Sequence, residues 1–505
     1  MQFPPELPVR KSVFWPPVIL LIFAVVLSIL YPGVFDLKMR EIQNWILINF
    51  SLGFSWLSFL MTLLIGWVFF SPLGKYRIGG ENAKPRLHTV SWFAIVLCTT
   101  IAVGILFWGS AEPLSHFLFP PEFFPIEQQS EAAKSFALGA LFFHWGFTPY
   151  AIYAVPALLF GLMYHQKKNK FRLGLMLKPT LGTKKSKLSE SLVDMISLFA
   201  LVAGMAASLG AGILSLSGGI QNIFPNVSFS LSSSVVTLLI VFTFVISAKS
   251  GIEKGIKNLS LFNLGFFLIF ISLFLILTNG EFLKNIMLGF QQYFSNFLDL
   301  SLQISGKKKQ WTYDWSTFNF AIWMAWAPIT ALFLGKIAIG RTVREFLLVS
   351  WFFPALFCLI WMGIFGGSTL DLALISPDKF LDSFVERGPE SIIYLVFEEI
   401  GYYPLFAGIF LIAMFISYVT AADSSTEALA SLSMRGGAED DFHVPSSIKI
   451  FWGILIGATA WIMINFSGID GVRILSVIGG LPALFFLSLV SIGLTLVSFS
   501  PKKYL

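Results

Sequence analysis

Long apolar stretches dominate the hydrophobic pattern of this chain, and short polar or charged segments separate them. Each stretch is near or above the length of about 20 residues that an α-helix needs to cross a bilayer. We predict twelve membrane-spanning helices, near residues 13–35, 47–71, 89–111, 132–164, 191–213, 233–248, 258–278, 315–338, 345–367, 403–432, 447–467 and 472–499. The pattern therefore predicts an all-α membrane protein.

The charge of the connecting segments alternates along the chain. The segment 72–88 carries four basic residues and 166–190 carries eight, whereas 114–130 and 219–232 carry neither Lys nor Arg. Basic loops are enriched on the cytoplasmic side of membranes. The alternation therefore predicts twelve spans in the cell (inner) membrane, with both termini in the cytoplasm.

Composition excludes most classes of soluble protein. The 505 residues are 56% hydrophobic and only 12% charged, with a mean hydropathy of +0.78, whereas soluble domains carry about 25% charged residues. A larger core cannot absorb this excess, because cores stop growing near 250–300 residues. The net charge of +6 lies in short loops, which indicates topology and not nucleic-acid binding. Cys98 and Cys358 both lie inside apolar segments, so neither a disulfide framework nor a metal cluster is indicated.

One apolar segment, 281–303, differs from the spans because it alternates between apolar and polar faces. This periodicity is typical of an amphipathic helix at the membrane interface, and a loop packed on the bundle is the alternative. Its apolar residues recur at intervals of three and four: Phe282, Ile286, Phe290, Tyr293, Phe297 and Leu300.

Aromatic side chains gather on one face of two predicted spans. At 100° per residue, the three of the fourth span fall within an arc of about 140°, and those of the eighth within about 80°. They are Trp145, Tyr150 and Tyr153 in the fourth span, and Trp323, Trp326 and Phe333 in the eighth. Most membrane aromatics face lipid or the interface, but mid-span N–H and O–H groups favour a protein interior. Since each ring face attracts a cation by roughly 0.5–2 kcal/mol, we predict a cage for a quaternary ammonium.

Few charged residues lie inside the spans. Intramembrane acids are functional candidates by default, which applies to Asp194, Asp423 and Glu427. Ordinary alternatives are a helix cap for Asp194 and nearby hydroxyl partners for Asp423. We interpret His144 as a helix contact and not as a proton relay. No metal site, nucleotide-binding loop or nucleophile constellation is recognised, so the chain is predicted not to be an enzyme.

Six short motifs occur in order: FWGSAEP, FFHWG followed by two tyrosines, SLGAG, W..WAP, GRTVREF and TAADSS. By these motifs the chain resembles the betaine/choline/carnitine transporter (BCCT) family from its first span to its twelfth. The resemblance implies a LeuT-type core of two inverted five-helix repeats that alternates access to a central site. The implied units are 1–88 with two peripheral spans, 89–280 and 315–499 as the repeats, 281–304 as the interfacial helix, and 500–505 as a short tail.

The resemblance also implies a site. An aromatic box of Trp145, Tyr150, Tyr153 and Trp323 would hold a trimethylammonium head, although Tyr150 replaces a position that is commonly tryptophan. Trp326 and Phe333 would contact substrate on its cytoplasmic path, and backbone amides near Gly104 are a candidate for the other end of the cargo. The family further implies a homotrimer embedded in membrane lipid, with segment 281–303 at the interface.

The chain departs from the sodium-coupled pattern of the family. Hydroxyls expected in the fifth span are replaced by Leu201 and Met205, which offer no hard oxygen ligand. Thr420 is kept, while Ile101 stands in a stretch that is usually glycine-rich. Thr420 and Ile101 remain candidates for a coupling sodium ion through hydroxyl or backbone oxygens. Proton coupling, with Glu427 as the carrier, and substrate exchange are the alternatives, and no resident cofactor is expected.

We therefore predict a secondary transporter that imports or exchanges choline, glycine betaine or carnitine. The alternative on the same fold is an ion-coupled carrier of a neutral amino acid or another osmolyte. A channel would differ by an unsaturable flux.

Overall fold

The apolar stretches fold into long α-helices, because backbone groups surrounded by lipid must bond within their own helix. The computed structural model describes residues 9–505 except 102–103, 122, 124, 168–170, 225, 251–252, 303–308 and 435–444. Its α-helices are α1 (Lys11–Leu30), α2 (Pro32–Phe70), α3 (Thr89–Ile101), α4 (Gly104–Leu118), α5 (Glu131–Trp145), α6 (Phe147–Lys167), α7 (Lys178–Ile223), α8 (Phe229–Ser250), α9 (Glu253–Leu277), α10 (Phe282–Leu302), α11 (Lys309–Trp311), α12 (Phe318–Ile337), α13 (Val343–Leu347), α14 (Phe353–Ile375), α15 (Pro377–Arg387), α16 (Ile392–Glu399), α17 (Tyr403–Ser433), α18 (Ser446–Phe499) and α19 (Pro501–Tyr504). Short 3-10 turns are η1 (Pro72–Lys75), η2 (Leu173–Leu177) and η5 (Pro389–Ser391), and π-helical turns are η3 (Thr312–Thr317) and η4 (Leu348–Phe352).

The all-α membrane fold predicted from the sequence is confirmed in the described part of the chain. Nine helices there are long and apolar enough to span a membrane, or ten if α3 and α4, which are bent by 51°, count as one span. The helix α18 contains the last two predicted spans, joined through a kink at Gly468 with φ +54°. The helix α8 is described in full side-chain detail only over Phe229–Thr243, so its length as a span stays a prediction. The count of twelve spans stays a prediction.

Two span boundaries differ from the sequence expectation. The helix α2 begins at Pro32, whereas the second span was expected from residue 47. Its first turns are polar and resemble a loop in sequence, but Arg40 bonds to Asp36 one turn earlier (2.8 Å) and to Asp470 (2.9 Å). These pairs support a helix through the charged segment. The fourth span is divided at Gly146, between α5 and α6.

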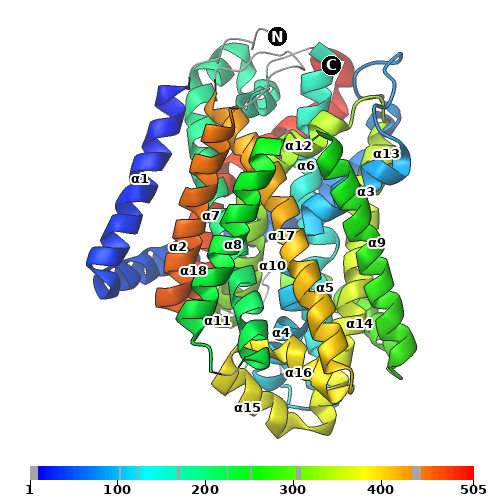
Figure 1. Ribbon diagram of the computed structural model, residues 1–505. Coiled ribbons are helices and arrows are strands. Elements are labelled where there is room, and N and C mark those ends of the chain that lie inside the picture. The colour runs from blue at the N-terminus through cyan, green and yellow to red at the C-terminus, as the bar shows by residue number, and fades with distance from the viewer. Residues whose placement is uncertain are drawn as a thin grey trace.

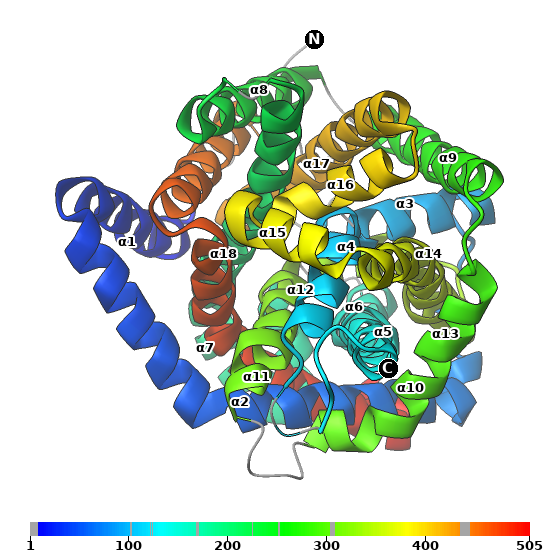
Figure 2. The ribbon, with the colours of Figure 1, turned by 90° about the horizontal axis from the view of Figure 1, so that it is seen from below.

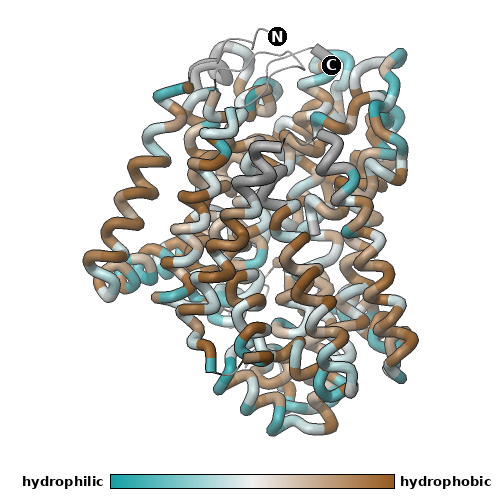
Figure 3. Tube along the Cα trace, in the orientation of Figure 1, coloured by the Kyte–Doolittle hydropathy of each residue, from teal (hydrophilic) through white to brown (hydrophobic). Residues whose placement is uncertain are grey.

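The helices divide into peripheral and central ones. In α1 only 33% of the most apolar window is buried, against 94% for the span Glu131–His165. The exposed side chains of α1 and α2 include Ile19, Phe23 and Ile48, as expected for surfaces that face lipid. Figure 3 shows apolar residues along the middle of the helices and polar residues toward the two ends.

The central helices pack in two groups. In one, α12 runs along α6, and α4 contacts α5 and α14; in the other, α7 runs along α18, and α17 contacts α7 and α8. The groups meet where α12 contacts α7 and α18. The start of α1 and the C-terminus lie at the same end of the molecule, and α15 and α16 cover the opposite end (Figure 1).

The predicted amphipathic helix is present as α10, which lies on the outside of the bundle beside α2 (Figure 2). It packs on α5 and α14 through a face that includes Asn285 and Tyr293. Asn285 donates to Asp371 of α14 (2.7 Å), which also pairs with the buried Lys134 of α5 (2.5 Å). Away from this contact α10 exposes mainly apolar side chains, among them Leu283 and Phe294, together with Lys284.

Candidate substrate site

Four aromatic rings from two stretches far apart in the sequence meet in the core. Trp323 of α12 lies at their centre, and its ring centroid is 4.7 Å from Tyr153, 5.2 Å from Tyr150 and 5.9 Å from Trp145. All four side chains are buried. Tyr150 and Tyr153 share a face of α6 because they are three residues apart, and Trp145 ends α5 at the Gly146 break. The rings predicted from the sequence are therefore neighbours.

The indole N–H groups of this aromatic box are bonded to protein and not left in an apolar environment. Trp323 Nε1 donates to Asn319 Oδ1 one turn earlier (3.0 Å), and Trp145 Nε1 donates to Glu112 Oε2 of α4 (2.7 Å). Such bonds satisfy the polar edge of a buried indole and fix its orientation. The second bond also places a carboxyl group directly behind one wall of the box.

Gly104, the first residue of α4, lies against Trp145. A β-carbon at residue 104 would come within 2.7 Å of Cη2 and 2.8 Å of Cζ3 of Trp145. The sequence suggested a backbone contact with substrate here. That contact stays a prediction, and the geometry adds that only a residue without a side chain leaves room for the Trp145 ring.

Two further aromatic residues of α12 lie beyond the box. The indole of Trp326 lies against Gly204 of α7, where an added β-carbon would be 3.1 Å from Trp326 Cδ1. Phe333 is partly buried against the core. Within the described part of the chain, neither has a ring contact with the box, and their role on a substrate path stays a prediction.

The candidate residues for ion coupling are only partly described. The side chains of Ile101 and Glu427 lie outside the described residues. The Thr420 hydroxyl donates to the Ile416 carbonyl (2.8 Å), and Leu201 and Met205 are buried on α7. The coupling predictions therefore stay untested, and so does the role of Asp423, whose side chain is likewise outside the described set.

Asp194 does not cap a helix as expected, because it lies within α7. It pairs with Arg10 Nη1 (2.5 Å) and accepts a hydrogen bond from the backbone N–H of Leu173 (3.2 Å). Arg10 also bonds to the backbone oxygens at the end of α17 through Ser433 and Leu432. The pair therefore ties the N-terminal segment to α7 and α17.

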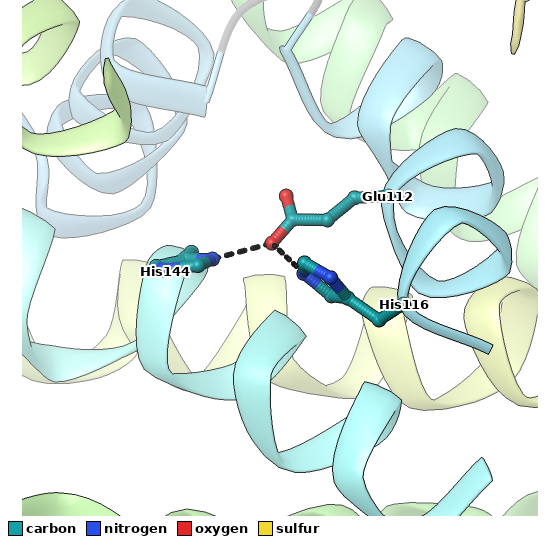
Figure 4. A group of neighbouring side chains, drawn as sticks. All are labelled: Glu112, His116 and His144. Carbon is teal, nitrogen blue, oxygen red and sulfur yellow. Dashed lines mark hydrogen bonds and ion pairs between the residues drawn. The ribbon is translucent and has the colours of Figure 1, made fainter. Parts of the chain in front are cut away.

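A group of ionisable side chains behind the box was missed by the sequence reasoning. Glu112 and His116 of α4 and His144 of α5 form a carboxylate–histidine cluster, with the Glu112 carboxyl pointing between the two imidazoles (Figure 4). Glu112 Oε1 is 2.5 Å from His144 Nδ1 and 3.6 Å from His116 Nε2, and all three side chains are fully buried. The spacing of Glu112 and His116 by four residues was the available signal, since it places them on one helix face.

A carboxylate with two imidazoles is a donor set that suits zinc, and the candidate ligand atoms lie within 4.8 Å of one another. The outer hydrogen bonds favour a different use. Trp311 Nε1 donates to His116 Nδ1 (3.3 Å), so a neutral His116 carries its hydrogen on Nε2, the atom that faces Glu112. Metal-bound imidazoles instead donate from their second nitrogen. The hydrogen bond from Trp311 therefore favours a protonated His116 Nε2 over a metal-bound one.

The fold and the buried aromatic box define a polytopic membrane protein with an internal site. The family model for betaine/carnitine/choline family transporters matches residues 12–500. The ectoine/hydroxyectoine transporter of Virgibacillus pantothenticus is 29% identical and covers 98% of both chains. The glycine betaine transporter OpuD of Bacillus subtilis is 29% identical over 94% of this chain and 91% of its own. The osmo-independent choline transporter BetT1 of Acinetobacter baylyi is 28% identical over 97% of this chain and 93% of its own.

The chain belongs to the betaine/carnitine/choline transporter family. It is therefore a multi-pass membrane transporter and not an enzyme.

Proposed function

We propose that this protein is a secondary transporter of a quaternary-ammonium compound such as choline, glycine betaine or carnitine. The observation that carries the proposal is the convergence of Trp145, Tyr150 and Tyr153 on Trp323. A trimethylammonium group has no hydrogen-bond donors, so it gains little from oxygen ligands. Each desolvated ring face attracts it by roughly 0.5–2 kcal/mol, and several faces together offset the loss of a weakly held water shell.

The charge behind the box supports a cation over a neutral cargo. Glu112 accepts the N–H of Trp145 at 2.7 Å, which adds negative potential on the side of the ring away from the substrate. A cargo without a positively charged group would gain nothing from this carboxyl group, whereas the quaternary ammonium of choline, glycine betaine or carnitine, and also the ammonium of an amino acid, would be attracted by it.

The rings of the box contact one another across two helices. Trp323 contacts Tyr153 with a centroid separation of 4.7 Å, so a displacement of these two rings changes the space that a methylated nitrogen would occupy. The rings belong to different helices, α6 and α12, so a relative movement of these helices displaces them. We propose that α4, α5, α6, α12 and α14 rock against α7, α8, α17 and α18, as in LeuT-type inverted repeats.

We further propose that the protein lies in the cell membrane with both termini in the cytoplasm, and that it assembles as a trimer through α10. The exposed face of α10 supports this assembly because it is apolar without facing the core: Leu283, Met287, Phe294 and Leu298.

A cyclic amidinium such as ectoine is a second candidate cargo. The ectoine/hydroxyectoine transporter of V. pantothenticus covers 98% of both chains. Ectoine also carries a delocalised positive charge that an aromatic box attracts, but its N–H groups need acceptors.

The test is a binding titration followed by tryptophan fluorescence of the purified protein. The ligands are choline, glycine betaine, carnitine, ectoine and 3,3-dimethyl-1-butanol, the neutral carbon isostere of choline, each with and without sodium. We expect saturable binding of at least one quaternary ammonium and none of the isostere. Equal binding of choline and its isostere would refute a cation site, and tight binding of ectoine alone would favour the second candidate.

A further inference from the structure

In the carboxylate–histidine cluster of Glu112, His116 and His144, the contacts of Glu112 and His144 suit more than one proton count. His116 Nε2 lies 3.6 Å from Glu112 Oε1 and makes no hydrogen bond there. Glu112 accepts from Trp145 Nε1 and His144 Nδ1, and His144 Nε2 lies 2.9 Å from the Ser316 hydroxyl. A hydroxyl can either donate to that nitrogen or accept from it. The cluster can therefore gain or lose one proton without breaking a contact.

These contacts allow two protonation states of the cluster. With both imidazoles neutral and Glu112 ionised, the net charge is −1, and the Ser316 hydroxyl donates to His144 Nε2. One proton from the aqueous medium then adds to His144 Nε2. The imidazolium donates to Ser316 Oγ and, through Nδ1, to Glu112, and the net charge becomes zero. The hydroxyl hydrogen of Ser316 turns away from His144, and no bond between heavy atoms changes.

Among the residues that the structure describes, few other ionisable groups face the cluster. Arg473 of α18 interacts with His116 across Trp315, which contacts His116 with a centroid separation of 4.4 Å and lies 5.2 Å under the Arg473 guanidinium. Arg473 is itself 3.6 Å from Asp470. From α14, the Cys358 thiol is within electrostatic reach of Glu112. The turn η3 contributes Ser316, and it is π-helical, a conformation that is frequent at functional sites.

We propose that the carboxylate–histidine cluster is a proton-binding site, and that its proton competes with the cation in the aromatic box. The competition rests on the proposed function. Glu112 is shared between the two sites because it bonds to His144 through Oε1 and to the box residue Trp145 through Oε2. A net charge of −1 behind Trp145 attracts a bound cation, and a neutral cluster does not. By linkage, a cation in the box must weaken proton binding by the same factor.

The sign of the effect follows from this charge count. The affinity for choline rises with pH, on the order of tenfold between the protonated and deprotonated cluster, for charges several ångströms apart in a partly polar interior. Choline binding correspondingly releases protons. If the cluster instead took up a proton together with the cargo, the affinity for choline would fall as the pH rises.

The first arm of the test needs no substrate. The chain has five histidines, so ¹⁵N-histidine NMR spectra of the purified protein can be assigned by single replacements. Between pH 5 and 9 we expect one shared titration of His144 and His116, with the proton of neutral His116 on Nε2. In Glu112→Gln, which keeps an acceptor for Trp145, this titration moves to lower pH. His165, at the far end of α6, serves as the control that does not respond. The absence of a titration, or no effect of Glu112→Gln, overturns the proton site.

Ser316→Ala is a milder second variant, should Glu112→Gln fail to fold. It removes the acceptor of the protonated His144 Nε2–H, so we expect the titration midpoint to fall. An unchanged midpoint contradicts the assignment of the proton to that nitrogen.

The second arm measures choline binding by calorimetry in two buffers of different ionisation enthalpy. We expect proton release on binding in the wild type and none in Glu112→Gln, while the exposed Glu398→Gln behaves as wild type. Choline affinity that is independent of pH, or higher at low pH, overturns the competition. If no quaternary ammonium binds at any pH, the proposed function and the competition both fail, and the first arm still decides the proton site.

Discussion

Gly104 and Trp145 are in direct contact, and the space between them has no room for a β-carbon. We expect Gly104→Ala to displace the Trp145 ring and to weaken binding of a quaternary ammonium about tenfold or more, because the ring loses both its place in the box and its bond to Glu112. The measurement is the dissociation constant from the fluorescence titration.

The matched control is Gly265→Ala on α9, where an added β-carbon meets nothing within 4 Å. Alanine at an open helix position is neutral or slightly stabilising. Equal loss of affinity in both variants would mean that Gly104 acts through general stability.

Trp323 is the ring that the other three contact, so its replacement is the direct test of the aromatic box. We expect Trp323→Ala to cost about 1–2 kcal/mol of binding free energy and Trp323→Phe to cost less, because phenylalanine keeps a weaker negative ring face. Trp56→Phe, at an exposed position of α2, is the control. Identical losses for alanine and phenylalanine would indicate that shape, and not the ring's charge distribution, holds the cargo.

Arg10 and Asp194 form an ion pair in which the Asp194 side chain is fully buried and that of Arg10 is 11% exposed. Arg10→Ala leaves a buried carboxylate without its partner, which costs up to about 3–5 kcal/mol of unfolding free energy. We expect the double variant Arg10→Ala with Asp194→Asn to recover part of that loss, measured by thermal unfolding in detergent. Lys38→Ala, which removes an exposed pair with Glu41, should change little. A double variant no more stable than Arg10→Ala would argue against the ion pair.

The exposed row on α10 provides a test of assembly. We expect Phe294→Glu to lower the mass of the detergent-solubilised particle from trimer to monomer, because a charge on an apolar interface is not paired. Phe294 is 63% exposed in the single chain. Val385→Glu introduces the same charge at an exposed position of α15 and should leave the mass unchanged. If Phe294→Glu remains a trimer, the interface between subunits is formed by another part of the surface.

Glu390 lies in η5, outside the spans, and its side chain packs against Gly218 of α7. Burial raises the pKa of Glu390 from 4.5 to about 7. Between these values the folded chain holds a proton that the unfolded chain has released, so the contribution of this carboxyl to stability falls as the pH rises. We expect Glu390→Gln to raise Tm more at pH 8 than at pH 5. A gain that does not depend on pH would show that the carboxyl is not desolvated in the folded protein.

Much of the architecture follows from the sequence because its causes are local. A helix in lipid requires a long apolar stretch, and a period of 3.6 residues decides which side chains share a face. The helical state of α10 and the common face of Tyr150 and Tyr153 were predictable on this ground. The early start of α2 was not, because its charged first turns depend on Asp470, a partner more than four hundred residues away.

The carboxylate–histidine cluster could not be predicted from local sequence patterns alone. The four-residue spacing of Glu112 and His116 was visible, but nothing near His144 in the chain indicates its partner. Their contact depends on the rotation and axial offset of α4 against α5, which the packing of many side chains sets together. For the same reason the contact between Gly104 and Trp145 was not expected from the sequence.

The sequence by itself determined a membrane-spanning helical protein, its family and the aromatic residues proposed to bind the cargo, because hydropathy, helical periodicity and short motifs are properties of neighbouring residues. Only the tertiary structure decided that Trp323 meets three other rings and that a carboxyl group shared with two histidines lies behind them. These contacts join helices far apart in the chain, and their geometry arises from packing between helices.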